Sequence, residues 1–229
     1  MSPKIIVSYD GTENDQDALA LGQFFRSLGA ELSLAYVRHT RESEYRREEL
    51  AHDEAERLLE GGARWLEDPD IKRHVVLSAS TPEGLAQLAQ QEGADVLVFG
   101  SDYHTAPGHV APGNSAARLL EGGHTAVAIA PAGLHEQPDV QISTIVAADD
   151  EGDRSAHETA LTIAERTGAR TAELGASADL LVVGSRNGTP HGRVSVSASL
   201  AYEIEVARCP VLVLPRGVAA HFGPVPVAA

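Results

Sequence analysis

Two stretches of this chain share one layout, and this internal repeat constrains the fold more than any other feature. The stretches are Asp95–Pro131 and Asp179–Pro215. In each, a short apolar run ends in a Gly-Ser pair (Gly100–Ser101 and Gly184–Ser185), a loop with glycine and proline follows, and a second apolar run closes at proline. Strand, glycine loop, helix and strand in this order are typical of parallel α/β sheets. The sequence therefore predicts a tandem duplication.

The first half of the chain alternates strand-like and helix-like segments. Between the first two strands, Ala18, Leu21, Phe25 and Leu28 recur at spacings of three and four, which indicates an amphipathic helix. This alternation with short connections predicts a doubly wound parallel α/β sheet covered on both faces. The expected strands are residues 4–9, 31–37, 71–77, 96–100 and 125–130.

The second half repeats this pattern in a shortened form. Ile142–Ala147 repeats the first strand, and Ala156–Thr167 repeats the first helix. The next interval is 55 residues shorter than in the first copy, so we expect the counterparts of the second and third strands, with their helices, to be missing. Only three strands then remain, and Ile142–Ala147 is left at a sheet edge. We expect a second chain, the linker or the C-terminal tail to cover that edge.

The repeat also sets the expected domain boundaries. A complete domain spans residues 1–133, a polar linker spans 134–140, and an abridged second domain spans 141–217. The remaining residues, 218–229, have little periodicity and are predicted to be flexible or draped on the surface.

Composition excludes several classes of function. The formal net charge of −15 opposes binding to nucleic acid and to anionic membranes. No apolar run approaches the roughly 18 residues that a membrane span requires, and no signal peptide is evident, so we expect a cytoplasmic protein. The single cysteine, Cys209, precedes a buried-looking strand and is interpreted as a core thiol. Neither a P-loop nor a Gly-x-Ser-x-Gly elbow is present, which predicts a protein that is not an enzyme.

At these residues the chain resembles the universal stress protein family, as one complete and one abridged repeat. The resemblance implies strand order 3-2-1-4-5. Nucleotide-binding members carry Gly-x2-Gly-x9-Gly-(Ser/Thr) between the fourth strand and the last helix. They also carry an aspartate after the first strand and a small apolar residue at the end of the second. Carried over residue by residue, the resemblance implies an adenine-nucleotide site formed by Asp10, Val37, Gly100, Ser101, Gly113, Asn114 and Ser115.

Two departures from that pattern argue for a degraded site in the first repeat. Tyr103 takes the place of the middle glycine, where a side chain would intrude on the approach of the backbone to phosphate. Asp102 stands where nucleotide-binding relatives often place a basic residue. A carboxylate about 4 Å from a phosphate charge costs roughly 1–4 kcal/mol, unless a divalent ion bridges the two. Asp10 has two open interpretations: a contact to ribose or a helix cap.

The second repeat departs further. Asn187 replaces the middle glycine and Ser197 the last one, and the strand that would face adenine is expected to be missing. We therefore expect the second repeat to bind no nucleotide. His104 and His109, in the first repeat's loop, are interpreted as exposed loop residues, and no metal site is expected.

These observations lead to one functional prediction with two alternatives. The prediction is a stress-response binding and regulatory protein of the universal stress protein type. One alternative is an ATP-binding switch or slow ATPase with ATP in the first repeat, and the other is a structural paralogue that modulates a full-length partner. The resemblance also implies a homo-oligomer, or an internal pseudo-dimer in which Ala126–Ala130 pairs with Val211–Leu214 through the last strands.

Overall fold

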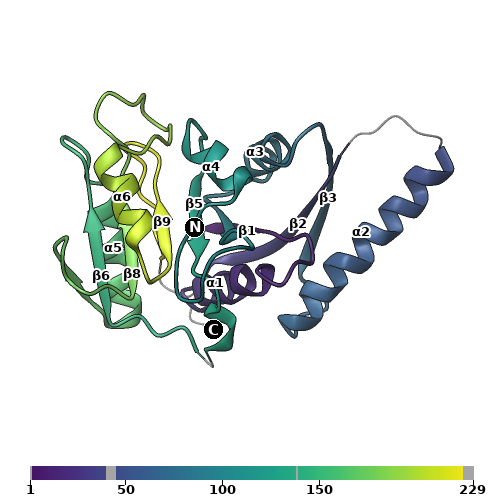
Figure 1. The fold of residues 1–229 in the computed structure, drawn as a ribbon, viewed down its shortest axis with the longest axis horizontal. Helices are drawn as coiled ribbons and strands as arrows, with labels where there is room; N and C mark the ends of the chain where they lie inside the picture. The colour runs from purple at the N-terminus through teal and green to yellow at the C-terminus, as the bar shows by residue number, and fades with distance from the viewer. Residues whose placement is uncertain (1, 40–44, 138, 224–229) are drawn as a thin grey trace.

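A computed structural model describes residues 2–39, 45–137 and 139–223, and its fold is a single twisted sheet with helices on both faces (Figure 1). Within these ranges nine strands follow the order β3-β2-β1-β4-β5-β9-β8-β6-β7. The strands are β1 (Lys4–Ser8), β2 (Glu31–His39), β3 (Lys72–Ser78), β4 (Val96–Gly100), β5 (Ala126–Ala130), β6 (Thr144–Ala148), β7 (Arg170–Ala172), β8 (Leu180–Val183) and β9 (Val211–Val213). The helices are α1 (Asp15–Ser27), α2 (Tyr45–Trp65), α3 (Thr81–Glu92), α4 (Asn114–Leu120), η1 (Leu134–Glu136), α5 (Ser155–Thr167) and α6 (Ala198–Val206).

The first lobe, β1–β5 with its helices, has the predicted doubly wound topology. Its order is 3-2-1-4-5, and every neighbouring pair within it is parallel. β1 lies between β2 and β4, so the chain reverses its winding direction beside β1. In doubly wound folds the crevice at this reversal, outside the carboxyl ends of the strands, is where ligands bind.

The two lobes join through their last strands, as the sequence predicted. β5 and β9 pair antiparallel, with Val127 opposite Val213 and Ile129 opposite Val211. The second lobe, β6–β9 with its helices, continues as β9-β8-β6-β7, which corresponds to strands 5-4-1-2 of the first lobe. The chain therefore forms an internal pseudo-dimer about this seam.

One prediction about the second lobe is wrong: the counterpart of the second strand is not missing. Arg170–Ala172 forms β7, pairs parallel with β6 and covers the edge that was expected to be open. Neither the linker nor the tail is needed for this. The segment was not recognised because its three residues include no large apolar side chain, so it has no strand-like apolar run. The missing elements are the counterparts of α2, β3 and α3.

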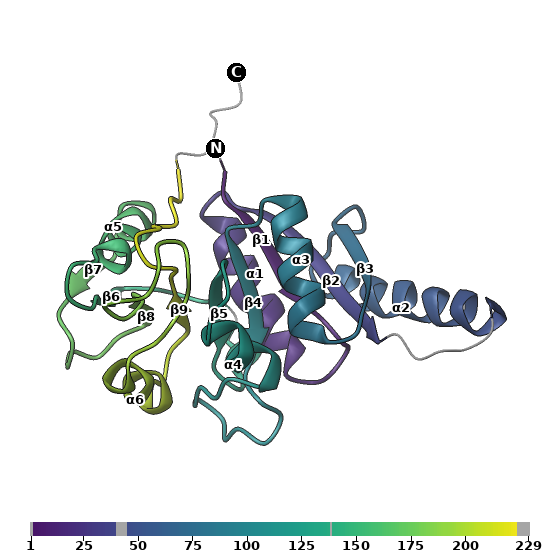
Figure 2. The same ribbon diagram turned by 90° about the horizontal axis from the view of Figure 1, so that it is seen from above.

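The core forms two layers, one on each face of the sheet (Figure 2). One layer lies under α1, α2 and α5 and includes Phe25, Leu59 and Ile163. The other lies under α3, α4 and α6 and includes Leu85 and Ile204. Within the described ranges, none of the helices is both long enough and apolar enough to cross a membrane.

The long charged helix α2 packs on the sheet through its glycines. Two adjacent glycines, Gly61 and Gly62, disfavour a helix, but α2 runs from Tyr45 through to Trp65. A Cβ atom on Gly62 would lie 2.9 Å from Cδ1 of Leu34 in β2 and 3.4 Å from the ring of Tyr9. The missing side chain of Gly62 therefore lets α2 pack closely on the sheet. This packing offsets the low helix propensity of glycine.

One residue of the predicted linker and two of the predicted tail pack into the core, although the tail was expected to be flexible or draped on the surface. Leu134 in η1 is buried, and so are Ala220 and Phe222. Phe222 stacks on Phe25 of α1 with ring centroids 5.5 Å apart, while Ala220 exchanges hydrogen bonds with α5 through Thr159 and Thr162. Residues 218–223 therefore bridge the two lobes, because one aromatic side chain fills the space between α1 and α5. Residues 224–229 lie outside the described residues.

Candidate functional site

A cleft of about 250 Å³ lies at the carboxyl ends of β1 and β4, beside the start of α1 and α4. It is the crevice where the winding of the first lobe reverses, as expected for a ligand site in this topology. Six of the seven residues proposed from the sequence line it. These are Asp10, Gly100, Ser101, Gly113, Asn114 and Ser115.

The seventh residue, Val37, lies apart from the cleft. It is 6% exposed and belongs to the core under α3. A Cβ atom on Gly84 of α3 would lie 2.9 Å from Cγ1 of Val37, so the helix packs directly on this side chain. Val37 stands at the expected place near the end of β2, but its side chain serves helix packing.

The two glycines of the motif have different roles. A Cβ atom on Gly100 would lie 2.2 Å from the carbonyl oxygen of Asn14, so the start of α1 itself requires a glycine there. At Gly113 no atom of the described residues lies within 4 Å of the Cβ position, and φ is an ordinary −68°. Gly113 is the N-cap residue of α4, a position that glycine favours, and it lines the cleft. The missing side chain leaves space at this point of the cleft.

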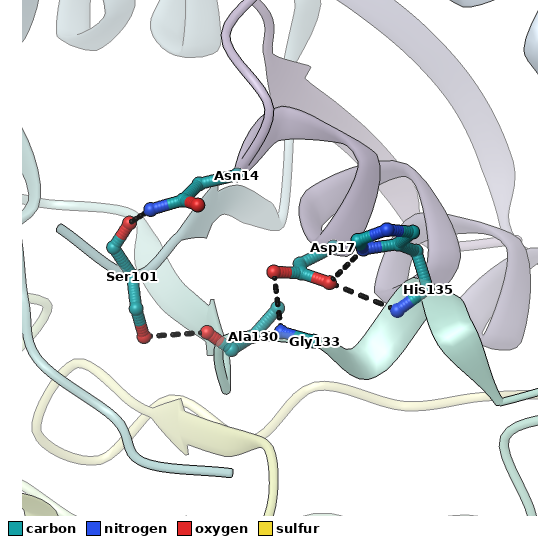
Figure 3. Close-up of polar contacts among 6 residues, drawn as sticks. All are labelled: Asn14, Asp17, Ser101, Ala130, Gly133 and His135. Carbon is teal, nitrogen blue, oxygen red and sulfur yellow. Dashed lines mark hydrogen bonds and ion pairs between the residues drawn. The ribbon is translucent and has the colours of Figure 1, made fainter. Parts of the chain in front are cut away.

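Ser101 is held by the protein, and its hydroxyl is not directed to a ligand (Figure 3). Its Oγ donates to the carbonyl of Ala130 at 2.7 Å and accepts the N–H of Ala111 at 3.2 Å. Its carbonyl accepts a hydrogen bond from Nδ2 of Asn14 at 2.9 Å. Ser101 therefore fastens the loop after β4 to β5 and to α1.

The second lobe repeats this fastening at the same sequence spacings. Oγ of Ser185 donates to the carbonyl of Leu214, 29 residues on, and accepts the N–H of Ser195, 10 residues on. The corresponding separations for Ser101 are also 29 and 10. The duplication of Gly-Ser in the sequence thus preserves a structural latch, and it is not a mark of ligand binding.

We expect Ser101→Ala and Ser185→Ala to destabilise the protein by similar amounts, about 1–3 kcal/mol each. Each substitution leaves one buried carbonyl and one amide without their partner. Chemical denaturation of both variants measures this. Ser199→Ala, at an exposed position of α6, is the control and should change stability by less than about 0.5 kcal/mol. A large loss at Ser101 with none at Ser185 would contradict a shared latch.

The two residues that depart from the nucleotide-binding pattern lie at the cleft's rim. Tyr103 is 74% exposed and stacks against the ring of His104, so its side chain projects to solvent and does not fill the cleft as the sequence suggested. Asp102 turns back on its own loop and accepts the N–H of His104 at 3.1 Å. Both residues line the cleft, so the carboxylate of Asp102 contributes negative charge there.

Asp15, which the sequence analysis missed, organises the loop after β1. Its Oδ2 accepts the backbone N–H groups of Asp10, Gly11 and Thr12 at 2.5, 2.8 and 3.3 Å. Burial, reinforced by the charge of Asp10, raises the pKa of Asp15 to about 7. Asp10 itself accepts the N–H of Thr12 and does not cap α1. The sequence signal that could have identified Asp15 was its position, an acidic residue in the first helical turn directly after a glycine-containing loop.

This raised pKa predicts a loss of stability toward alkaline pH. Because the folded state raises the pKa of Asp15 above its ordinary 3.8, its contribution to stability is full below about pH 4 and is lost as pH rises through about 7. The fall stays below about 1.4 kcal/mol per pH unit, since one proton is involved. Denaturation at pH 5.5 and pH 8 should show Asp15→Asn flattening this dependence. An unchanged pH profile in the variant would contradict the assignment.

The electrostatic character of the cleft is negative. Asp10, Asp15 and Asp102 all line it, and no lysine, arginine or histidine does so among the described residues. Its volume also falls below the roughly 300–1,000 Å³ of typical small-molecule sites. The arrangement can take an uncharged or cationic group, or an anion that brings its own cation.

In the second lobe, protein contacts occupy the space beside Gly184, while a cleft of about 520 Å³ lies at the carboxyl ends of β6 and β7 and is lined by Asp149, Arg154 and His157. Arg216 donates to the carbonyls of Ser185 at 3.2 Å and Glu151 at 2.9 Å. A Cβ atom on Gly184 would lie 2.7 Å from Oδ1 of Asp149, whose carboxylate caps α5. That the second repeat binds no nucleotide stays a prediction.

Comparison with known proteins identifies the family. The model of the Universal stress protein family matches residues 1–131. No curated protein sequence matches the chain. Among solved structures, a universal stress protein from Archaeoglobus fulgidus DSM 4304 is 16% identical, with a TM-score of 0.60 over 95% of this chain and 100% of the other.

Two proteins of Pseudomonas aeruginosa are similar over the same extent. A putative universal stress protein from strain UCBPP-PA14 gives a TM-score of 0.63 at 14% identity, covering 94% of each chain. A protein of unknown function from strain PAO1 gives 0.62 at 14% identity, covering 94% of this chain and 93% of the other. At these identities the likeness supports the fold of both lobes, while the family match rests on the first. The chain belongs to the universal stress protein family.

Proposed function

We propose that this protein is a binding and regulatory member of the family, acting in the stress response, whose first-lobe cleft does not hold a free nucleoside triphosphate. The observation that carries the proposal is the charge of the cleft: the carboxylates of Asp10 and Asp102, a partly ionised Asp15 whose pKa is raised to about 7, and, among the described lining residues, no basic side chain. Each carboxylate close to a phosphate charge adds roughly 1–4 kcal/mol of repulsion at about 4 Å. For a triphosphate to bind, the contacts of the loop backbone with phosphate would have to contribute more free energy than this repulsion costs.

The proposal is of binding and not of catalysis. A general base must have an oxygen or nitrogen within reach of the substrate's proton. Asp15 has a pKa near that of a base, but its Oδ2 already accepts three backbone N–H groups, and the residue is only 9% exposed. The Ser101 hydroxyl is likewise engaged with Ala130 and Ala111. Asp15 and Ser101 are the residues of the cleft best suited to catalysis, but hydrogen bonds within the protein already occupy both side chains.

A second candidate function, an ATP-dependent switch that binds ATP together with Mg²⁺, is favoured by Gly113. The open space beside this glycine is what close approach of a phosphate group requires. A divalent cation shared between phosphate and the carboxylate of Asp102 would reverse the sign of their interaction. In this alternative, the acidic residues at the rim favour binding of ATP with Mg²⁺ over binding of free ATP.

Thermal-shift measurements with ATP in EDTA and with ATP and Mg²⁺ separate these candidates. A ligand at 100 times its dissociation constant stabilises the folded state by about 2.7 kcal/mol, which is readily seen as a shift in Tm. The proposal expects no shift in EDTA. A shift only with Mg²⁺, lost in Asp102→Ala, supports the switch. A shift in EDTA contradicts the electrostatic argument.

A further inference from the structure

A cavity distinct from the first-lobe cleft lies between α1, the end of α2 and the segment that follows η1. It measures about 370 Å³ and shares no lining residue with that cleft. This volume falls within the range of small-molecule sites, which the cleft does not reach. Phe24 and Trp65 contribute aromatic surface to the lining, and Ala20 and Val140 contribute aliphatic surface. The cavity can therefore hold the carbon chain of a small ligand.

His135 lines this cavity with a ring whose orientation is fixed from behind. Nδ1 of His135 lies 2.6 Å from Oδ1 of Asp17, which also accepts the backbone N–H of His135, while Oδ2 accepts that of Gly133 (Figure 3). Because Asp17 acts as an acceptor throughout, Nδ1 carries the hydrogen of their contact. Nε2 of the neutral ring is then a hydrogen-bond acceptor, and none of the described residues donates to it.

Two further lining side chains present acceptors. Oγ of Ser27 donates its hydrogen to the carbonyl of Phe24 at 2.7 Å, so only its lone pairs remain. Asp139 is acceptor-only when ionised and forms no ion pair within the described part of the chain. Gln23 and Gln137 can offer either a donor or an acceptor. Among the described lining residues there is no lysine or arginine, so the polar part of the cavity is acceptor-rich and negative.

We propose that this cavity binds a small aliphatic primary ammonium ion. Such a group carries three N–H donors, a positive charge and no acceptor, which complements His135, Ser27 and Asp139. Its carbon chain lies on the rings of Phe24 and Trp65, and a tryptophan face also attracts a cation. The net charge of −15 raises the concentration of cations near the surface. An anion is repelled by Asp139, which has no basic neighbour in the lining to offset it.

Three probes of equal chain length test this chemistry on the full chain. n-Pentylamine carries the charge and the N–H donors at neutral pH, pentyltrimethylammonium carries the charge without the donors, and 1-pentanol lacks the charge. Trp65 is the only tryptophan of the chain, so its fluorescence reports on this cavity directly. We expect saturable fluorescence change and calorimetric heat with millimolar n-pentylamine. The other two probes should bind at least about tenfold more weakly, because each lacks a charge-assisted hydrogen bond.

Two isosteric substitutions locate the contact. Asp139→Asn removes the charge that the ammonium ion faces and should weaken n-pentylamine binding by about tenfold or more. Glu136→Gln is the matched control, since it removes the same charge from an exposed position of η1 outside the cavity lining, and it should leave the affinity unchanged. Both positions are exposed, so circular dichroism and Tm should not change.

Three results overturn the proposal. The first is the absence of both heat and fluorescence change with n-pentylamine at millimolar concentration. The second is binding of 1-pentanol or pentyltrimethylammonium as tight as that of the amine, which means that apolar contact or charge alone is recognised. The third is an equal effect of Asp139→Asn and Glu136→Gln, which means that the amine responds to the overall charge of the protein and not to this cavity.

Discussion

Asp17→Ala is expected to lower the free energy of unfolding by about 3–5 kcal/mol, the cost of removing one partner of a buried charged network. Asp17 lies in α1 and is 1% exposed. Its Oδ2 accepts the N–H of Gly133, and its Oδ1 accepts the N–H of His135, each at 2.9 Å (Figure 3). Nδ1 of His135 lies 2.6 Å from the same Oδ1. This carboxylate therefore holds the segment after β5, which leads into the second lobe, on the first helix.

His135→Ala separates the two parts of this network. The variant keeps both backbone N–H groups bonded to Asp17 and loses only the ring contact, so we expect a cost of about 1 kcal/mol. Urea denaturation of the two variants gives the comparison. Equal losses would mean that the ring, and not the backbone of the linker, is what Asp17 stabilises.

The second large effect is expected at Phe222, in the segment that bridges the lobes. Phe222→Ala should cost about 3 kcal/mol, the lower end of the range for a buried phenylalanine, because the tail near its end can relax into the space. The ring is 3% exposed and stacks on Phe25. Arg166 of α5 donates to the carbonyls of Leu28 and Gly223, so the same segment also joins α5 to α1.

Two variants make the Phe222 result specific. Val218→Ala, at a position 39% exposed in the same segment, should change stability by less than about 0.5 kcal/mol. Phe25→Leu removes the other ring of the stack but keeps an apolar side chain, and it should lose less than Phe222→Ala. If Phe222→Ala is as mild as Val218→Ala, the tail does not contribute to the joining of the lobes.

The strands of the first lobe could be predicted from simple apolar signals, whereas their order 3-2-1-4-5 and the pairing of β5 with β9 were implied by the resemblance to the family. Apolar runs of three to five residues mark β1, β4 and β5, and the second copy repeats them at matching offsets. β7 and the tail carry no such signal. Arg170–Ala172 is polar or small, and Phe222 is a single aromatic residue in a stretch without periodicity. Only tertiary contacts give them their structure.

The candidate site could be located from the sequence, but not interpreted. Six of the seven residues implied by the resemblance line one cleft, yet the sequence pattern cannot tell a glycine required by the start of α1, Gly100, from one that leaves open space, Gly113. For Ser101 a signal was available: the Gly-Ser pair recurs in the second copy, and the serine there bonds to partners at the same sequence separations. A hydrogen-bond pattern shared by both lobes indicates a structural role.

The central claim is that an acidic rim makes the first-lobe cleft reject free nucleoside triphosphate, and isothermal titration of the wild-type protein and Asp102→Arg with ATP in EDTA tests it most directly. The account predicts no binding to the wild type at millimolar ATP and measurable binding to the variant, because an arginine replaces repulsion by a paired charge. Binding of metal-free ATP to the wild type, unchanged or weakened by Asp102→Arg, would contradict it.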